Sequence, residues 1–378
     1  NSVNRYLFSV RQDSTFRMGD SELHYCGWDH WGGTGLYINS DDAVVENSLI
    51  SHNFYGIYVS SSGAVIRNNN ITANEHGVTV GGDPQIYNNH ISWNTVGISI
   101  AGGSPSIQNN TIMSNPGTGV VIGNSTPVIR NNLITNNGDQ GINSYSYSSS
   151  IIFNNTISSN SEGIVSSDHD SSTISENVIT ANHVGVHCDS NSSAIIQNNN
   201  ITANGESGIL CVDANPTIQG NNISQNTNAG ISVGGGASPI IYNNTIISNM
   251  WAGINPNNGA NPTIRDNVIM KNGAGIFCVL NASSTISGNT IAENLEMGIG
   301  CHNYSNPTIA NNIITSNIGW GGGIHCSYHS DPTIKDNTII ANSKGIECVE
   351  YSNPTIQNNN VTANSHGIIL SYSNSTIR

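Results

Sequence analysis

Glycine followed by a branched apolar residue recurs along the chain at a nearly fixed interval, and this period limits the fold more than any other feature. The step between successive glycines is 20 to 25 residues, most often 22. A fixed period of this size is typical of a solenoid, in which each repeat stacks on the next. The glycines of this column are Gly35, Gly56, Gly77, Gly97, Gly119, Gly141, Gly163, Gly185, Gly208, Gly230, Gly253, Gly275, Gly298, Gly323, Gly345 and Gly367.

The apolar residues within one repeat have the spacing of strands. After Gly323, Ile324 and Cys326 alternate with polar residues, and Ile334 and Ile339 follow in short segments separated by Ser, Asn and Pro. We therefore predict an all-β fold, a parallel β-helix of about 15 coils with roughly 22 residues and three short strands in each coil. Because such coils lie about 4.8 Å apart, residues one repeat apart in sequence become neighbours in space.

Asparagine fills two columns of the repeat, one from Asn69 to Asn359 and the other from Asn74 to Asn364. Asparagine tolerates the left-handed backbone conformation at tight bends. Its amide can also donate to one neighbouring coil and accept from the other. We therefore expect buried asparagine ladders at the bends, beside a core of inward Ile and Val columns.

The pattern N-P-T-I-x-N-N-x-I-x-x-N-x-x-x-G-I resembles the right-handed parallel β-helix repeat family, from about Gly35 to Arg378. That family includes NosD-like periplasmic proteins, carbohydrate-binding and sugar-hydrolase domains, and the pectate-lyase-like superfamily. A weaker resemblance is to methanogen surface proteins and to disaggregatase, which acts on a matrix polysaccharide. The resemblance implies a right-handed, single solenoid and an extracellular, cell-surface or periplasmic location. It leaves the activity open, because members include hydrolases, lyases, epimerases and proteins without known chemistry.

The two ends of the chain depart from the repeat. Residues 1–34 lack the consensus, and we expect them to form an N-terminal cap with an irregular first coil, since a solenoid end exposes unpaired strand edges. Sugar contacts through Trp28 and Trp31 are the alternative for this segment. The β-helix is expected over residues 35–378, and its C-terminal end shows no cap, which predicts contact with a further domain or end-to-end contact with another chain.

Six cysteines share one inward column, where other coils carry Val, Ile or Ser. We expect them to pack as small buried hydrophobes. Neighbouring coils bring paired cysteines within disulfide range, so free thiols and disulfides both stay open. The candidate pairs are Cys188–Cys211, Cys278–Cys301 and Cys326–Cys348.

A first polar patch gathers carboxylates, histidines and tyrosines that precede the next P-T-I motif in successive coils. Carboxylates one or two coils apart would lie roughly 5–10 Å apart, a range that covers both geometries of glycoside hydrolysis. The predicted catalytic residues are Asp168, Asp170, Asp189, His169 and His187, and the predicted substrate-binding residues are Tyr145, Tyr147 and Asp213. One alternative is a solvated polar bend without a function. Another is a calcium site formed by Asp168, Asp170 and Asp189.

A second polar patch lies in three later coils and includes the stretch "GIHCSYHSDPTI". Tyr304, His329 and Tyr351 share one column of the repeat, and His325 and Glu347 share another. We predict a substrate-binding face built from His302, Tyr304, His325, Tyr328, His329, Glu347, Glu350 and Tyr351. A bland surface is the alternative, and a copper or zinc site with imidazole ligands is a third.

Composition narrows the class of partner. Ten Lys and Arg stand against 24 Asp and Glu, and the net charge is −14, which disfavours nucleic acid and anionic membrane surfaces. No apolar run is long enough to span a bilayer. We predict a polysaccharide-processing protein with a polysaccharide partner and no required cofactor, a glycoside hydrolase rather than a lyase. The alternatives are a non-enzymatic surface, matrix or carbohydrate-binding protein and, from the NosD resemblance, periplasmic metal handling.

Overall fold

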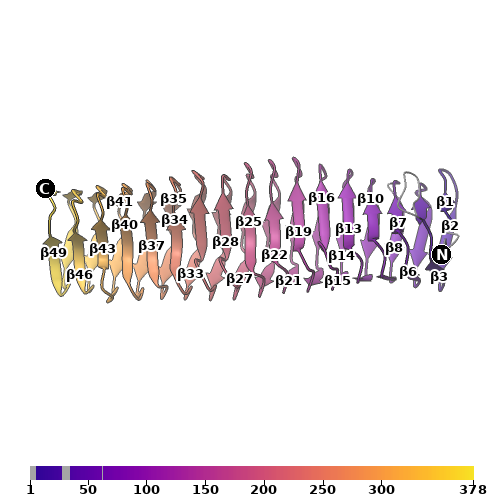
Figure 1. Ribbon diagram of the computed structural model, residues 1–378, viewed down its shortest axis with the longest axis horizontal. Helices are drawn as coiled ribbons and strands as arrows, with labels where there is room; N and C mark the ends of the chain where they lie inside the picture. The colour runs from indigo at the N-terminus through magenta and orange to yellow at the C-terminus, as the bar shows by residue number, and fades with distance from the viewer. Residues whose placement is uncertain (1–5, 28–34, 62) are drawn as a thin grey trace. The chain divides into compact units, whose positions relative to one another are not determined.

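The computed structural model describes residues 6–27, 35–61 and 63–378, and it divides into two compact units between His183 and Val184. Every helix or strand in the described residues is a β-strand, so the all-β prediction is confirmed. In each unit the coils contribute three short strands in turn, and each strand pairs in parallel with its counterpart in the next coil (Figure 1). Each unit is therefore a parallel β-helix, as predicted. No helix of the described residues is long and apolar enough to cross a membrane.

The strands of the first unit form three parallel sheets, which we number in the order in which the chain visits them. Sheet 1 contains β1 (Phe8–Val10), β4 (Leu36–Ile38), β7 (Tyr55–Val59), β10 (His76–Val80), β13 (Val96–Ala101), β16 (Val120–Gly123), β19 (Gln140–Tyr145) and β22 (Glu162–Ser166). Sheet 2 contains β2 (Phe16–Gly19), β5 (Ala43–Glu46), β8 (Val65–Arg67), β11 (Gln85–Tyr87), β14 (Ser106–Gln108), β17 (Val128–Arg130), β20 (Ile151–Phe153) and β23 (Thr173–Ser175). Sheet 3 contains β3 (Glu22–His24), β6 (Leu49–Ser51), β9 (Asn70–Thr72), β12 (His90–Ser92), β15 (Thr111–Met113), β18 (Leu133–Thr135), β21 (Thr156–Ser158) and β24 (Val178–Thr180).

The second unit repeats this arrangement. Its sheet 1 contains β25 (Val184–Cys188), β28 (Ile209–Val212), β31 (Ile231–Gly234), β34 (Ala252–Pro256), β37 (Ala274–Val279), β40 (Met297–His302), β43 (Gly322–Ser327), β46 (Lys344–Cys348) and β49 (His366–Leu370). Its sheet 2 contains β26 (Ile195–Gln197), β29 (Thr217–Gln219), β32 (Ile240–Tyr242), β35 (Thr263–Arg265), β38 (Thr285–Ser287), β41 (Thr308–Ala310), β44 (Thr333–Lys335), β47 (Thr355–Gln357) and β50 (Thr376–Ile377). Its sheet 3 contains β27 (Asn200–Thr202), β30 (Asn222–Ser224), β33 (Thr245–Ile247), β36 (Val268–Met270), β39 (Thr290–Ala292), β42 (Ile313–Thr315), β45 (Thr338–Ile340) and β48 (Asn360–Thr362).

The core of each unit consists of the apolar columns that the repeat predicts. In the first unit Ile57, Val78 and Ile98 are direct partners in neighbouring strands of sheet 1, and all three are fully buried. Each such side chain contributes about 1.5–3 kcal/mol when it is removed from water. Because side chains alternate across a strand, the residues between them point outward, and these outward positions carry the functional candidates.

Asparagine side chains connect neighbouring coils through hydrogen bonds. In the second unit the Asn267 amide donates to the Asn289 side-chain oxygen at 3.0 Å and to the Ile241 carbonyl at 3.0 Å. The expected left-handed conformation belongs to a different residue, the one immediately before each ladder asparagine, as in Asn68 and Asp266 with φ of 56° and 57°. The bend therefore divides two tasks between two neighbours, one for backbone geometry and one for hydrogen bonding.

The predicted N-terminal cap includes a regular coil. Within the described residues, β1, β2 and β3 pair in parallel with β4, β5 and β6. Residues 6–27 therefore contribute a paired coil, where the sequence led us to expect an irregular one. Trp28, His30 and Trp31 lie outside the described residues, and the capping role of this segment stays a prediction.

The cysteine column is buried and carries free thiols. All seven cysteines are buried and unpaired by disulfides. Strand pairing places Cys278, Cys301, Cys326 and Cys348 in consecutive coils of the second unit. Burial raises the pKa of the Cys278 thiol to about 12, so this residue behaves as a small apolar side chain.

Candidate functional site

The part of the first predicted patch that lies in the first unit forms an exposed corner. Asp168 and His169 follow β22, and their side chains are about half exposed, with His169 Nδ1 3.3 Å from an Asp168 oxygen. The His169 ring stacks on Tyr147 of the neighbouring coil, with ring centroids 4.8 Å apart and planes 14° apart. Tyr145 lies nearby at the end of β19 and is 37% exposed.

Asp170 does not belong to this exposed corner, which corrects the prediction of an outward carboxylate. Its side chain is 0% exposed. The hydroxyls of Ser144, Ser166 and Ser172 donate to its two oxygens at 2.9, 2.5 and 2.7 Å. Burial raises the pKa of Asp170, and the serine hydrogen bonds partly offset that effect. A carboxyl group enclosed in this way holds the inside of the coil together and cannot contact a polysaccharide.

The other members of the first patch lie in the second unit. His187 is an outward residue of β25, and Asp189 comes directly after this strand. Asp189 is partly buried, and one of its oxygens has no hydrogen-bond partner among the described residues. Cys188 and Cys211 are direct partners in the neighbouring strands β25 and β28. Asp189 follows Cys188 by one residue and the exposed Asp213 follows Cys211 by two, so the two aspartates are not at equivalent positions of the repeat. Their catalytic and substrate-binding roles stay predictions.

The second predicted patch separates into two features within the second unit. The first is a stack of rings on the corner after sheet 1, which we call the corner stack: Tyr304, His329 and Tyr351. The Tyr304 and His329 rings lie 5.3 Å apart with planes 5° apart, and the His329 and Tyr351 rings lie 5.4 Å apart with planes 12° apart. The shared column predicted from the sequence is therefore present. Tyr328 directly precedes His329 in the sequence and is exposed. Glu350 directly precedes Tyr351 and is half-buried.

The second feature lies on the outward face of sheet 1 and is centred on a buried histidine. His325 of β43 is only 6% exposed, and its Nδ1 lies 3.0 Å from a carboxylate oxygen of Glu347, its direct partner in β46. Lys344 Nζ donates to both oxygens of the same carboxylate at 2.7 Å. The carboxylate is thus held from two sides, and it fixes the orientation of the imidazole.

Aromatic rings surround this histidine. Trp320 meets the His325 ring edge-on at 4.9 Å, and the His302 ring lies 5.2 Å from it. Phe277 packs edge-on against His302 at 4.8 Å, and Trp251 packs against Phe277 at 5.8 Å. In Figure 1 the strands that carry most of these residues, β37, β40, β43 and β46, follow one another as neighbouring arrows. We call this group the histidine cluster: Trp251, Phe277, His302, Trp320, His325, Lys344 and Glu347.

Burial keeps both histidines of the cluster neutral. Burial, with a smaller contribution from the neighbouring His325, lowers the pKa of His302 to about 4. Burial also lowers the pKa of His325, although Glu347 partly offsets this. His302 Nε2 and the hydroxyl of Ser327, its partner in the next strand, are buried without a hydrogen-bond partner among the described residues. The cluster therefore combines a neutral, oriented imidazole with two neighbouring buried polar atoms that have no hydrogen-bond partner among the described residues.

Glycines give the cluster its shape at two positions. Gly300 lies between Phe277 and His325 in the outward column, and a Cβ there would come within 2.7 Å of the Phe277 ring. Gly322 has a φ of +66°, and a Cβ there would lie 2.5 Å from the Lys344 carbonyl. The first glycine leaves room for the ring, and the second lets the segment that carries Trp320 turn back into β43.

Sequence reasoning found His302, His325 and Glu347 but missed Trp251, Phe277, Trp320 and Lys344. Trp320 stands in the longest repeat, the 25-residue step from Gly298 to Gly323. That extra length, with a tryptophan followed by three glycines, was the clue in the sequence. Phe277 and Lys344 occupy outward positions of sheet 1 strands, and the same alignment of repeats would have placed them beside the histidines.

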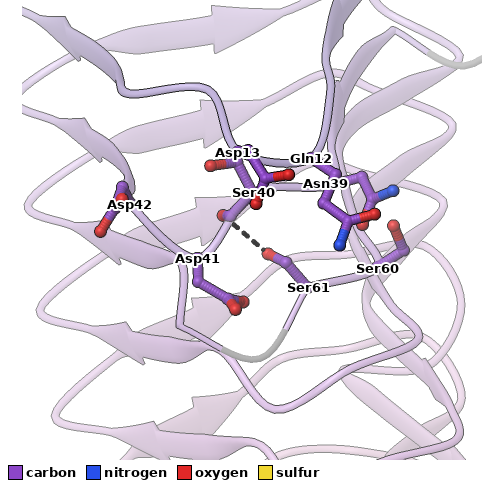
Figure 2. Close-up of a pocket in the computed structure, with 8 residues that line it drawn as sticks. All are labelled: Gln12, Asp13, Asn39, Ser40, Asp41, Asp42, Ser60 and Ser61. Carbon is purple, nitrogen blue, oxygen red and sulfur yellow. Dashed lines mark hydrogen bonds between the residues drawn. The ribbon is translucent and has the colours of Figure 1, made fainter.

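An acidic pocket in the first unit was also missed. Figure 2 shows it among the first coils, with a volume of about 390 Å³ and a lining of Gln12, Asp13, Asn39, Ser40, Asp41, Asp42, Ser60 and Ser61. Ser61 donates to the Ser40 carbonyl at 2.9 Å, and Asp41 accepts from the Gly63 amide at 2.8 Å. Asp13 lies on one segment and the adjacent Asp41 and Asp42 lie on another, and the three side chains do not converge on one point in Figure 2. In the part of the chain that the structure describes, no group of three or more His, Cys, Asp or Glu side chains is arranged to hold a metal ion.

Comparison with known proteins gives a family and a fold. A family model described as the right-handed beta helix region matches residues 6–85, 34–179, 76–217, 163–294 and 278–378, which together span nearly the whole chain. No curated protein matches the sequence.

Solved structures resemble the chain at low sequence identity. The A-module of a mannuronan C-5 epimerase from Azotobacter vinelandii is 15% identical, with 81% of this chain and 88% of that chain covered and a TM-score of 0.43. A double mutant of a periplasmic alginate epimerase is 12% identical, with 80% and 77% covered and a TM-score of 0.49. A tailspike protein of an E. coli bacteriophage, solved in complex with a pentasaccharide, is 10% identical, with 96% and 74% covered and a TM-score of 0.38. At these identities the likeness concerns the fold alone.

Proposed function

The chain belongs to the right-handed β-helix family, and we propose that its second unit binds a polysaccharide across the histidine cluster and processes it by proton transfer at His325. The observation that carries this proposal is the 3.0 Å contact of His325 with Glu347 inside a ring of aromatic side chains. With Nδ1 held by the carboxylate, Nε2 is the nitrogen left to exchange a proton with a bound sugar or water. Trp320, which is 53% exposed, offers the face on which a sugar ring can stack.

The charges of this face favour a neutral glycan over a polyuronate. Among the described sheet 1 strands of the second unit, Lys344 is the only lysine or arginine, and both of its short contacts go to Glu347. A uronate carboxylate would therefore find no uncommitted cation on these strands. A neutral polysaccharide is the substrate class that we propose.

Glycoside hydrolysis is the reaction that we propose first, with elimination as the alternative. Hydrolysis needs a base that takes a proton from the attacking water and an acid that protonates the leaving oxygen, and a neutral imidazole whose Nδ1 is held by a carboxylate can serve as that base. Elimination needs the charge of a uronate to be neutralised, which the paired Lys344 does not supply. A polysaccharide partner is consistent with an extracellular, cell-surface or periplasmic location, which stays a prediction.

The test is a polysaccharide screen that measures reducing ends and unsaturated products in parallel. We expect reducing ends without unsaturated products from the wild type, and a loss of at least about 100-fold in His325→Gln. Glu293→Gln, at an exposed glutamate of the second unit that pairs with Lys271, is the control and should keep full activity. Activity should persist through the ordinary pKa of histidine and fall only at lower pH, since the neutral form is required and burial lowers the pKa of His325. Full activity in His325→Gln would remove the assignment, and unsaturated products would replace hydrolysis with elimination.

The corner stack supports a second candidate function, glycan binding without chemistry. Three rings of consecutive coils present a continuous edge, with Tyr304 57% and Tyr351 62% exposed. If this function is the correct one, the screen should yield no product from any polysaccharide. Binding should then be lost in Tyr351→Ala and kept in His325→Gln, which is opposite to the result expected for the histidine cluster.

A further inference from the structure

A column of aromatic side chains in the first unit is interrupted by one small residue. The residues that follow the sheet 3 strands β3, β6, β9 and β12 are Tyr25, His52, Ala73 and Trp93, one in each consecutive coil. All four have left-handed backbones, with φ between 56° and 58°, so their side chains leave the corner in the same way. The Tyr25 and His52 rings lie 5.4 Å apart, but Ala73 places no ring between His52 and Trp93.

A pocket occupies the place of the missing ring. Its volume is about 480 Å³, and its lining includes Tyr25, His52, Ala73 and Trp93 of this column. Coils lie about 4.8 Å apart, so rings two coils apart leave a slot about 10 Å from centre to centre, which is enough for one further ring between them. Another corner of the same unit shows that rings one coil apart stack, since the Tyr147 and His169 ring centroids lie 4.8 Å apart.

As far as the structure describes them, the remaining walls of the slot carry a negative charge and no positive charge. Glu75 lies in the same coil as Ala73, lines the pocket and is exposed, and no ion pair or hydrogen bond of its carboxylate is found among the described residues. Phe54 and Thr95 line the pocket on either side of it. No lysine or arginine lines the slot in the described part of the chain. The pocket therefore offers two aromatic rings and one carboxylate acceptor, which fits a ring with C–H faces and hydroxyl donors at its edge.

We propose that this slot binds a single neutral pyranose unit, sandwiched between His52 and Trp93, with Glu75 accepting hydrogen bonds from its hydroxyl groups. The site is separate from the histidine cluster and does not depend on the function proposed there. It has the volume of an ordinary small-ligand pocket and requires no rearrangement of the backbone. Its role is recognition, because Glu75 is the only carboxylate among the described residues of its lining and glycoside hydrolysis commonly uses a pair.

The decisive variant fills the slot from inside the protein. Ala73→Phe should complete the ring column, because His52 and Trp93 show that a large ring is tolerated on this left-handed backbone. Ser159→Phe is the matched control: Ser159 is exposed at the same position of a later coil in the same unit, with a φ of 57°. It adds the same ring and leaves the slot open.

The experiment measures binding of methyl glucoside, methyl galactoside, methyl mannoside and N-acetylglucosamine by saturation-transfer NMR and isothermal titration. We expect at least one of these sugars to bind the wild type and Ser159→Phe equally. Affinity should fall at least about tenfold in Ala73→Phe and in Trp93→Ala, and about threefold in Glu75→Gln. Thermal unfolding of each variant verifies that the fold is intact.

Three results would overturn the proposal. The first is undiminished sugar binding in a folded Ala73→Phe variant, which would place the sugar elsewhere. The second is the absence of binding to the wild type by all four sugars. The third is tighter binding of adenosine than of any sugar, which would assign the slot to a planar aromatic ligand. Because the variants change only the first unit, these results are independent of the polysaccharide screen.

Discussion

The exposed corner of the first unit and the histidine cluster of the second unit were predicted by the same reasoning, but their structures differ. At the corner, Asp168 points into solvent while Asp170, two residues later, is enclosed by serine hydroxyls. In the cluster, His325 and Glu347 face each other across neighbouring strands, as their shared column requires. The comparison shows that outward and inward directions can be assigned from sequence along a strand but not around a corner.

The reason for this difference lies in the backbone of the corner. Asp168 and His169 both have left-handed backbones, with φ of 49° and 62°. Two such residues in succession reverse the direction of the chain, so the simple alternation of side chains no longer holds and Asp170 turns inward. His325 and Glu347 lie within strands β43 and β46, where alternation is maintained by pairing with both neighbouring coils.

The largest expected effect is a difference in the free energy of unfolding between alanine variants of Asp168 and Asp170. Asp170→Ala leaves the hydroxyls of Ser144, Ser166 and Ser172 without their acceptor in a buried site, and should lower the free energy of unfolding by about 3 kcal/mol. Asp168→Ala removes an exposed side chain and should change it by less than about 0.5 kcal/mol. Denaturant unfolding of the two variants measures both values. Equal stabilities would mean that Asp170 is not enclosed as described.

The next effect tests whether Glu347 orients His325 within the cluster. Glu347→Gln keeps the shape of the side chain but removes the charge that Lys344 and His325 share, and should lower kcat about 30-fold on the glycan found by the screen. Glu293→Gln, at an exposed glutamate of the same unit that pairs with Lys271, is the control. If both variants kept wild-type kcat, the carboxylate would have no positioning role.

The smallest effect concerns the pH dependence of stability. The pKa of His302 is about 4 in the folded protein and near 6.5 in the unfolded chain, so between these values only the unfolded state binds the proton. The stability from neutral His302 is complete above pH 6.5 and is lost as the pH falls toward 4. Partial exposure limits the loss to about 1–2 kcal/mol.

Comparison of variants at two pH values isolates this contribution. The difference in unfolding free energy between pH 7 and pH 5 should shrink in His302→Gln and stay unchanged in His366→Gln, an exposed histidine of the same sheet. If the difference between the unfolding free energies at pH 7 and pH 5 were as large in His302→Gln as in the wild type, His302 would not be held neutral by burial.

The sequence predicts what depends on the repeat. The 22-residue period gives the stacking of Asn267 on Asn289, of His325 on Glu347 and of His329 on Tyr351, because each pair is one coil apart. The period does not predict where the longest repeat sends Trp320, since a segment that interrupts the strands follows its own turn geometry. It also does not predict that Lys344 neutralises Glu347, which depends on side-chain rotamers over three residues of β46.

The central claim is that a polysaccharide lies across the histidine cluster, and hydroxyl-radical footprinting tests it most directly. The probe is the shortest oligosaccharide of the glycan found by the screen, added in saturating amounts to the wild-type protein. We predict that Trp320 and Trp251 become protected from oxidation while Tyr147, at the exposed corner of the first unit, stays as reactive as in the free protein. Protection of Tyr147 with no change at Trp320 would contradict the account.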